Sequence, residues 1–173
     1  MRTVWVVRIG DVPDGRLREV ISRLEAGLAM PVRLAEESLD PAYALDEVRR
    51  QYRSDLLLER LAETGTRPGK MLGVTDLDLF IPVLTFVFGE AQLKGRAAIV
   101  SSYRLRSEMY GLRPDRNLLL ERLVKEALHE LGHTRGLFHC YNPECVMQPS
   151  TYAELIDLKP ARYCPSCELS LSG

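Results

Sequence analysis

Residues 129–139 read HELGHTRGLFH, and this stretch contains all three histidines of the chain. It continues an apolar pattern that predicts a helix. Residues four apart on a helix share one face, so the imidazoles of His129 and His133 can point at a single ion. Glu130 is turned by about 100° from His129, which places its carboxylate beside such an ion rather than on it.

The third histidine needs a reversal of the chain. His139 lies six residues after His133, where a straight helix could not bring it to the same ion. Gly136 permits the left-handed conformation that ends a helix and turns the chain back. Three neutral imidazoles leave a fourth position open to water, as in catalytic zinc sites. A helical HExxH alone is also found without this role, but the added glycine and third histidine make the pattern much more restrictive.

All four cysteines follow within the next 28 residues, as two pairs. The first pair is Cys140 and Cys145, and the second is Cys164 and Cys167 with the short two-residue spacing. Four thiolates can hold one tetrahedral structural zinc, which would stabilise a segment poor in apolar runs. One or two disulfides, or reactive thiols, are the alternatives. We therefore expect two zinc ions per chain, with the shared bond between His139 and Cys140 joining their sites.

The rest of the chain reads as an α+β scaffold. Apolar and β-branched runs predict strands, and apolar residues at helical spacing predict helices. The expected strands are 3–9, 32–35, 71–75, 84–88 and 97–103, and the expected helices begin at Asp14, lie within 46–63 and run from Asp115 to about Arg135. We expect a single domain, 1–173, with a sheet-and-helix part, 1–136, and a small zinc-stapled part, 137–173.

Composition narrows the possible partners and the compartment. The chain has 173 residues and a net charge of −1, so no overall basic field would attract nucleic acid or an anionic membrane. The apolar run at Val4 to Val7 is broken by Arg8 and is too short for a signal peptide. We therefore expect a cytoplasmic protein, in which clustered cysteines more often bind metal than form disulfides.

At these motifs the sequence resembles the archaemetzincins, a family of the metzincin clan of zinc metallopeptidases. In that family the third histidine is followed by cysteine and by a four-cysteine pattern with a methionine. The matching features here are HELGHTRGLFH, His139-Cys140, Cys140-x4-Cys145, Cys145-x-Met147 and Cys164-x2-Cys167, together with the segments LTFVFGEA and AAIVSSYRL. The 16 residues between Met147 and Cys164 are one fewer than in the family pattern.

The resemblance implies a metzincin-like zincin fold, a twisted mixed β-sheet with two long helices. It implies that Met147 packs below the imidazoles without binding zinc. It also implies that Gly89 to Ala91 form the edge that pairs with substrate backbone, and that Gln148 to Tyr152 wall the pocket beyond the cleaved bond. Tyr152 could approach the metal, although a packed or exposed tyrosine is the simpler interpretation.

Together these observations predict a zinc-dependent metallopeptidase acting on peptides or proteins. The ion would lower the pKa of its water, and Glu130 would take the proton and pass it to the leaving nitrogen. The alternative is a zinc-stabilised peptide-binding protein with negligible turnover, against which a general base at Glu130 argues. Nothing in the sequence indicates the oligomeric state.

Overall fold

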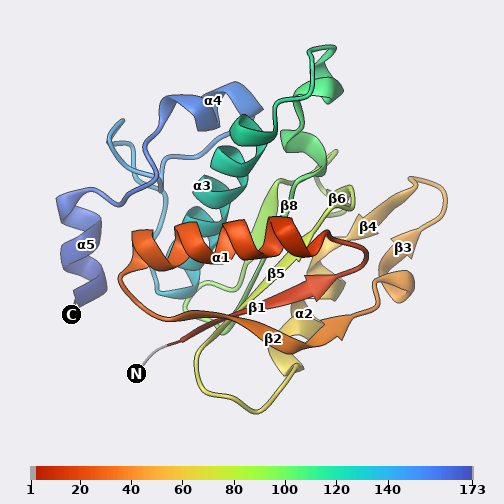
Figure 1. Cartoon of the computed structure of the whole chain (residues 1–173), viewed down its shortest axis with the longest axis horizontal. Helices are drawn as coiled ribbons and strands as arrows, with labels where there is room; N and C mark the ends of the chain where they lie inside the picture. Colours follow the sequence, from red (N-terminus) through yellow and green to blue (C-terminus); the bar gives the residue numbers. More distant parts are fainter. Residues whose placement is uncertain (1–2, 173) are drawn as a thin grey trace.

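The protein is built on a five-stranded mixed sheet, and the computed structural model describes residues 3–172 (Figure 1). The strand order is β2-β1-β5-β8-β7. The strands are β1 (Val4–Ile9), β2 (Val32–Leu39), β5 (Lys70–Thr75), β7 (Gly89–Ala91) and β8 (Ala97–Ser101). Strands β2, β1, β5 and β8 are mutually parallel, whereas β7 pairs with β8 in the antiparallel sense and forms one edge.

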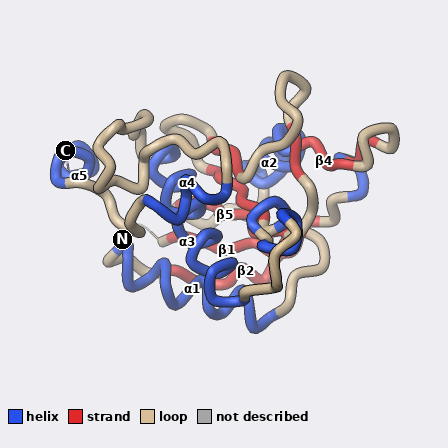
Figure 2. Tube along the Cα trace, turned by 90° about the horizontal axis from the view of Figure 1, so that it is seen from above, coloured by secondary structure: helices blue, strands red, loops and turns tan. Residues whose placement is uncertain are grey.

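Helices cover both faces of this sheet, which explains why its central strands are almost continuously apolar. The helices α1 (Asp14–Leu28) and α3 (Arg116–Thr134) lie on one face, and α2 (Ser54–Glu63) lies on the other (Figure 2). Side chains alternate between the two layers: Val4 and Val6 of β1 join the core under α1 and α3, whereas Val7 and Ile9 join the core under α2. The α+β fold with two long helices, expected from the sequence, is confirmed.

The long helix α3 starts where its capping residue predicts. The carboxylate of Asp115 accepts a hydrogen bond from the Leu118 amide at 2.9 Å, as an N-cap residue does. The helix then packs against β8 and α1, so most of its later turns are buried. This burial fixes α3 along the sheet, and with it the position of His129 and His133 in its last turns.

Smaller elements extend the fold at its far side. A three-stranded sheet has the order β3-β4-β6, and single 3-10 turns connect the larger elements. These elements are β3 (Leu45–Asp46), β4 (Gln51–Arg53), β6 (Leu79–Phe80), η1 (Ala42–Ala44), η2 (Tyr103–Leu105) and η3 (Ser107–Tyr110). Figure 1 shows β3 and β4 reaching away from the main sheet.

The strand expected at 84–88 is wrong. These residues form a loop in which only Val87 makes an isolated bridge, to Leu79, and the edge strand β7 starts at Gly89. A turn at Pro82 redirects the chain, and Arg49 donates to the carbonyls of Leu84 and Thr85, which replaces strand pairing. Two other strands differ in length: the one expected at 32–35 continues to residue 39, and the one expected at 97–103 ends at 101.

The C-terminal part packs on the main core more than its composition indicates. It contains α4 (Ala153–Leu158) and α5 (Pro165–Ser172). Val146, Ile156 and Tyr163 are buried in the same cluster as α1 and α3, so this segment does not rely on metal alone. The second cysteine pair lies at the start of α5, with Cys164 just before the helix and Cys167 in its first turn.

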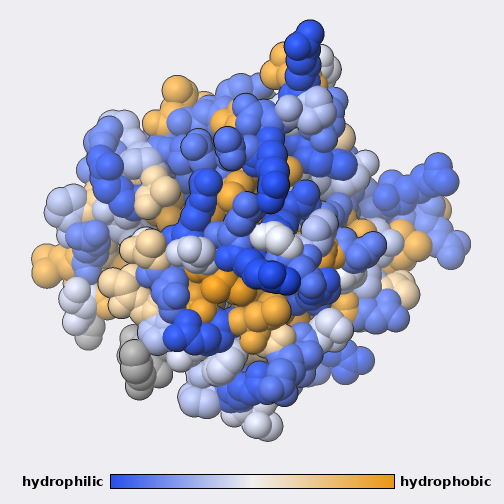
Figure 3. Space-filling view, in the orientation of Figure 1, coloured by the Kyte–Doolittle hydropathy of each residue, from blue (hydrophilic) through white to orange (hydrophobic). Residues whose placement is uncertain are grey.

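Among residues 3–172, none of the helices combines the length and the apolar character that a membrane crossing requires. The face over α1 is mainly hydrophilic, with apolar side chains in small patches (Figure 3).

Candidate metal centres and active-site cleft

The three histidines meet at the end of α3. His129 and His133 lie one turn apart, and their Nε2 atoms are 3.1 Å from each other. His139 joins them from the following loop, and one ring nitrogen from each of the three lies within 4.8 Å of the others. Zn–N bonds of about 2.0–2.1 Å in a tetrahedral site put ligand nitrogens about 3.4 Å apart, so the cluster has the dimensions of a zinc site.

The reversal that brings in His139 occurs at Gly136. Its φ of +96° lies in the region that favours glycine. The Leu137 amide donates to the Gly132 carbonyl at 3.0 Å, and the Gly136 amide donates to the His133 carbonyl at 3.0 Å. These two bonds are the Schellman pattern of a helix C-terminus. The expected end of the helix is confirmed.

Two backbone carbonyls orient the helical imidazoles. Nδ1 of His129 lies 2.9 Å from the Val146 carbonyl oxygen, and Nδ1 of His133 lies 2.8 Å from that of Leu137. Nδ1 then carries the proton and donates, which leaves Nε2 free to bind a metal. Burial lowers the pKa of His129 to about 3, so its ring is neutral, the form that ligates.

Glu130 is buried next to the triad, with 7% of its surface exposed. Burial raises the pKa of its carboxyl well above the usual value, and the carboxylates of Glu126 and Glu90 add to the rise. Gly89 of β7 makes this approach possible, because a Cβ there would lie 2.9 Å from Glu130 Cγ and 2.6 Å from the Ile99 carbonyl oxygen.

A cleft of about 440 Å³ runs past Glu130 and two of the three histidines. The loop 84–88 and the start of β7 form one wall, α3 forms the floor, and residues 149–151, after Met147, form the opposite wall. The lining residues are Leu84, Thr85, Phe86, Val87, Phe88, Gly89, Glu126, His129, Glu130, His139, Pro149, Ser150 and Thr151. Tyr152 is not among them and is 66% exposed, which favours the simpler of its two interpretations.

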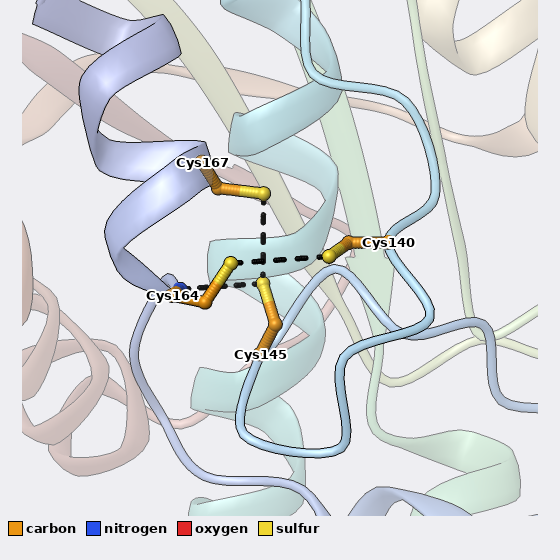
Figure 4. A group of neighbouring side chains, drawn as sticks. All are labelled: Cys140, Cys145, Cys164 and Cys167. Atoms are coloured by element: carbon orange, nitrogen blue, oxygen red, sulfur yellow. Dashed lines mark hydrogen bonds between the residues drawn. The ribbon is translucent and has the colours of Figure 1, made fainter.

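The four cysteines form a second cluster, between the loop that follows His139 and the start of α5 (Figure 4). The sulfurs of Cys140 and Cys164 are 3.9 Å apart, and those of Cys145 and Cys167 are 3.7 Å apart. Disulfide sulfurs lie about 2.05 Å apart, whereas four Zn–S bonds of about 2.3 Å in a tetrahedron separate the sulfurs by about 3.8 Å. The geometry fits one zinc, and all four cysteines are free.

The cysteines of this cluster differ in how readily they ionise without a metal. Burial raises the pKa of Cys145 and of Cys167, so neither would ionise readily by itself. Backbone hydrogen bonding from Cys167 lowers the pKa of Cys164 to about 7, and the Cys164 amide donates to Cys145 Sγ at 3.4 Å. Buried thiols of this kind deprotonate when a metal binds them.

Met147 lies between the two clusters and is fully buried. A Cβ added at Gly132 would overlap its sulfur, so the glycine lets this side chain pack against α3 one turn after His129. The Cys140 amide donates to the Met147 carbonyl at 3.0 Å, which ties the start of the cysteine cluster to the same turn.

Sequence reasoning missed a buried ion pair at the cleft. Lys159 Nζ lies 3.1 Å from Glu126 Oε1, and the lysine side chain is fully buried. The position of Glu126, four residues before Glu130, places it on the same face of α3 as Glu130. Nothing in the sequence near Lys159 indicates that it meets this face.

An α+β fold with three converging histidines and a buried glutamate along a cleft is the arrangement of zinc-dependent metallopeptidases. Residues 26–172 match peptidase family M54. The archaemetzincin of Thermococcus kodakarensis is 39% identical over 180 residues, covering 99% of this chain and 96% of the relative. The archaemetzincin of Methanocaldococcus jannaschii is 42% identical over 164 residues, covering 95% and 89%. The chain therefore belongs to the archaemetzincin family.

Solved structures agree with this assignment. A zinc-dependent peptidase from Methanocorpusculum labreanum superposes with a TM-score of 0.84 at 34% identity, covering 97% of this chain and 99% of the other. The archaemetzincin of Archaeoglobus fulgidus, complexed with malonate, gives 0.83 at 31% identity with the same coverage.

Proposed function

We propose that this metallopeptidase hydrolyses peptide bonds of peptide or protein substrates with a catalytic zinc held by His129, His133 and His139. The observation that carries the proposal is the convergence of three imidazoles beside the buried Glu130 at the cleft, two of them oriented by backbone carbonyls. Zinc bound there would activate a water molecule and stabilise the negative charge that develops on the substrate carbonyl.

Glu130 is the general base and acid in this proposal. Its carboxylate takes the proton from the attacking water and then gives it to the leaving nitrogen. Burial keeps this proton transfer out of bulk solvent. No nucleophilic serine or cysteine is needed, because water is the nucleophile. The cysteines lie in their own cluster rather than along the cleft.

The edge strand β7 supports backbone recognition of an extended substrate. It ends the order of the main sheet, so its outer edge is free to pair among the described strands. Gly89 of β7 lines the cleft next to Glu130. An extended peptide added to this edge would pass along the glutamate, which is β-strand addition, in a metzincin-like arrangement.

The second zinc is structural in this proposal, held by Cys140, Cys145, Cys164 and Cys167. It adds to the apolar packing of the part 137–173, which we keep as a subdomain of one domain. Thiols used as metal ligands, rather than as disulfides, suit a reducing compartment such as the cytoplasm.

Glu130→Gln tests the proposed function. The variant should keep both zinc ions and lose about 10²- to 10⁴-fold in kcat, because only the proton acceptor is removed. Peptide hydrolysis followed by mass spectrometry, with metal content measured on the same sample, checks this. Glu121→Gln is the matched control, since Glu121 lies on the same helix but is exposed.

A Glu130→Gln protein with unchanged turnover would contradict the role of this residue. Zinc-loaded wild-type protein that binds peptides but cleaves none would favour the alternative, a zinc-stabilised peptide-binding protein.

A further inference from the structure

Glu126, which pairs with the buried Lys159, and Ser150 make up the polar end of the cleft. Glu126 lines the cleft one helical turn before Glu130 and is only 4% exposed. Lys159 lies behind it, outside the lining, with Nζ 3.1 Å from Glu126 Oε1 and 3.0 Å from the Gln148 carbonyl oxygen. The carboxylate therefore faces the cleft, and its counter-charge is enclosed by protein.

A buried hydroxyl at this end of the cleft has no hydrogen-bond partner among the described residues. It belongs to Ser150, which lines the same cleft. Glu126 Oε1 contacts the lysine as an ion pair but receives no aligned hydrogen bond from the described residues. Buried polar atoms are rarely left without partners, so the Ser150 hydroxyl indicates a missing polar neighbour, whereas Glu126 Oε1 already has Lys159.

The side walls have the opposite character. Phe86 and Phe88 line one side of the cleft, and Pro149 lines the other. A substrate side chain bound here would contact these apolar walls as well as Glu126 and Ser150. An apolar stem with a polar tip suits such a lining.

Building on the proposed peptidase function, we infer that this end of the cleft selects a neutral substrate side chain with an apolar stem and a terminal hydrogen-bond donor, as in glutamine. The side chain belongs to one of the two residues that flank the cleaved bond, because Glu126 is one turn from Glu130. The donor bonds to the Glu126 carboxylate, and the carbonyl of the same amide accepts from the Ser150 hydroxyl.

The charges of Glu126 and Lys159 disfavour acidic and basic substrate side chains at this end. Glu126 and Lys159 already neutralise each other, so a charged substrate group would be buried without a counter-charge of its own. An acidic side chain would also meet the Glu126 carboxylate first. A basic side chain would add a cation next to Lys159 and the zinc site. A purely apolar side chain would leave Ser150 and Glu126 without the bonds that glutamine supplies.

The first experiment measures selectivity of the zinc-loaded wild-type protein. A library of short peptides locates the cut, and matched peptides then carry Gln, Leu, Lys or Glu at each of the two flanking positions. At one position we expect kcat/KM for Gln to exceed that for Lys and for Glu by about tenfold or more, and that for Leu by about threefold. Equal values for Gln, Lys and Glu at both positions would overturn the inference.

Single charge removals provide a gain-of-function test. Lys159→Met leaves Glu126 without its partner, so a substrate lysine should now be preferred over glutamine. Glu126→Gln leaves Lys159 unpaired and should shift the preference to a substrate glutamate. Glu126→Gln combined with Lys159→Met removes both charges and serves as the neutral control. It keeps the test valid if one of the single variants misfolds. It should again reject both charged peptides. A profile that stays the same in all three variants would refute the inference.

A binding measurement separates this inference from the proposed function. The zinc-loaded Glu130→Gln protein should bind the Gln peptide about tenfold more tightly than the Lys and Glu peptides, whether or not the wild type cleaves them. Failure of hydrolysis with this order of affinities would contradict only the peptidase mechanism. Hydrolysis with no order among the peptides would contradict only the selectivity.

Discussion

A buried and a half-buried carboxylate lie at β7 on opposite faces of the sheet. Glu130 reaches Gly89 from α3, whereas Glu90 points to the other face, where the Ser54 hydroxyl donates to its Oε2 at 2.5 Å. Burial raises the pKa of both carboxyls. Of the two, only Glu130 lines the cleft, so the raised pKa of Glu90 bears first on the stability of the fold.

We expect Glu90→Gln to stabilise the protein at neutral pH. The pKa of Glu90 is higher in the folded than in the unfolded chain, so the folded state holds this proton more tightly. The stability that this proton contributes is complete below the unfolded pKa and is lost as pH rises through the folded pKa. The amide keeps the bond to Ser54 without the charge. Urea unfolding at pH 7 and pH 4 should show a gain that is present at pH 7 and absent at pH 4.

Glu121→Gln, at an exposed site on α3, serves as the control and should show no such pH-dependent difference. A Glu90→Gln protein that is less stable than the wild type at pH 7 would disprove this account of Glu90.

At the scale of elements, the packing of Met147 on α3 depends on a glycine. Gly132→Ala should lower the unfolding free energy by about 1–3 kcal/mol, because the new Cβ overlaps the methionine sulfur. Gly27→Ala on α1 is the matched control, since its Cβ would lie 3.9 Å from Leu128, an ordinary contact. There the same substitution should stabilise by about 0.5–1 kcal/mol. Denaturant unfolding of both variants decides whether the signs differ.

The loop 81–88 forms one lip of the cleft and is fixed from outside by Arg49. The guanidinium donates to the Leu84 carbonyl at 2.8 Å and to the Thr85 carbonyl at 2.9 Å, and it stacks 3.8 Å from the Phe80 ring centroid. We expect Arg49→Ala to raise KM by about threefold to tenfold, with an unfolding free energy changed by only about 1 kcal/mol. Faster hydrogen exchange across 81–88 would accompany the change.

Arg23→Ala, an exposed arginine on α1, should alter neither KM nor the exchange of the loop. Unchanged KM in Arg49→Ala would show that the loop holds its position without this anchor.

The same loop shows where prediction from sequence ended. The helix α3 could be predicted because its cap, its apolar spacing and its terminal glycine all lie close together in the sequence. The run of apolar residues at 84–88 resembles a strand locally. Its loop conformation depends on Arg49, more than thirty residues earlier, whose contacts the local pattern does not show.

For the whole molecule, the two metal sites should contribute unequally to stability. Cys145→Ser removes a buried ligand of the structural site, and we expect one zinc fewer per chain and a Tm lowered by about 10 °C or more. His133→Ala also removes one zinc and abolishes hydrolysis, but it should lower the Tm by only a few degrees. Metal analysis and calorimetry on the same samples test both statements. Equal losses of Tm would contradict the assignment of one catalytic and one structural site.

The grouping of histidines and cysteines into two clusters could be predicted, because their ligands are rare residues at informative spacings. The contact of Lys159 with Glu126 could not, since it depends on how the C-terminal part packs against α3. The same packing buries Tyr163, whose hydroxyl donates to the Leu128 carbonyl at 2.7 Å. Long-range packing of this kind has no local pattern in the chain.

The attachment of His139 to the cysteine-containing segment has a consequence for how the enzyme would lose activity on heating. The third imidazole keeps its position only while the segment after Gly136 stays folded, whereas the parallel strands are enclosed by helices on both faces. A local opening of that segment costs less free energy than unfolding of the sheet. On heating, the catalytic half-life would therefore follow the lifetime of the folded C-terminal segment. Activity would be lost at a lower temperature than the one at which the whole protein unfolds.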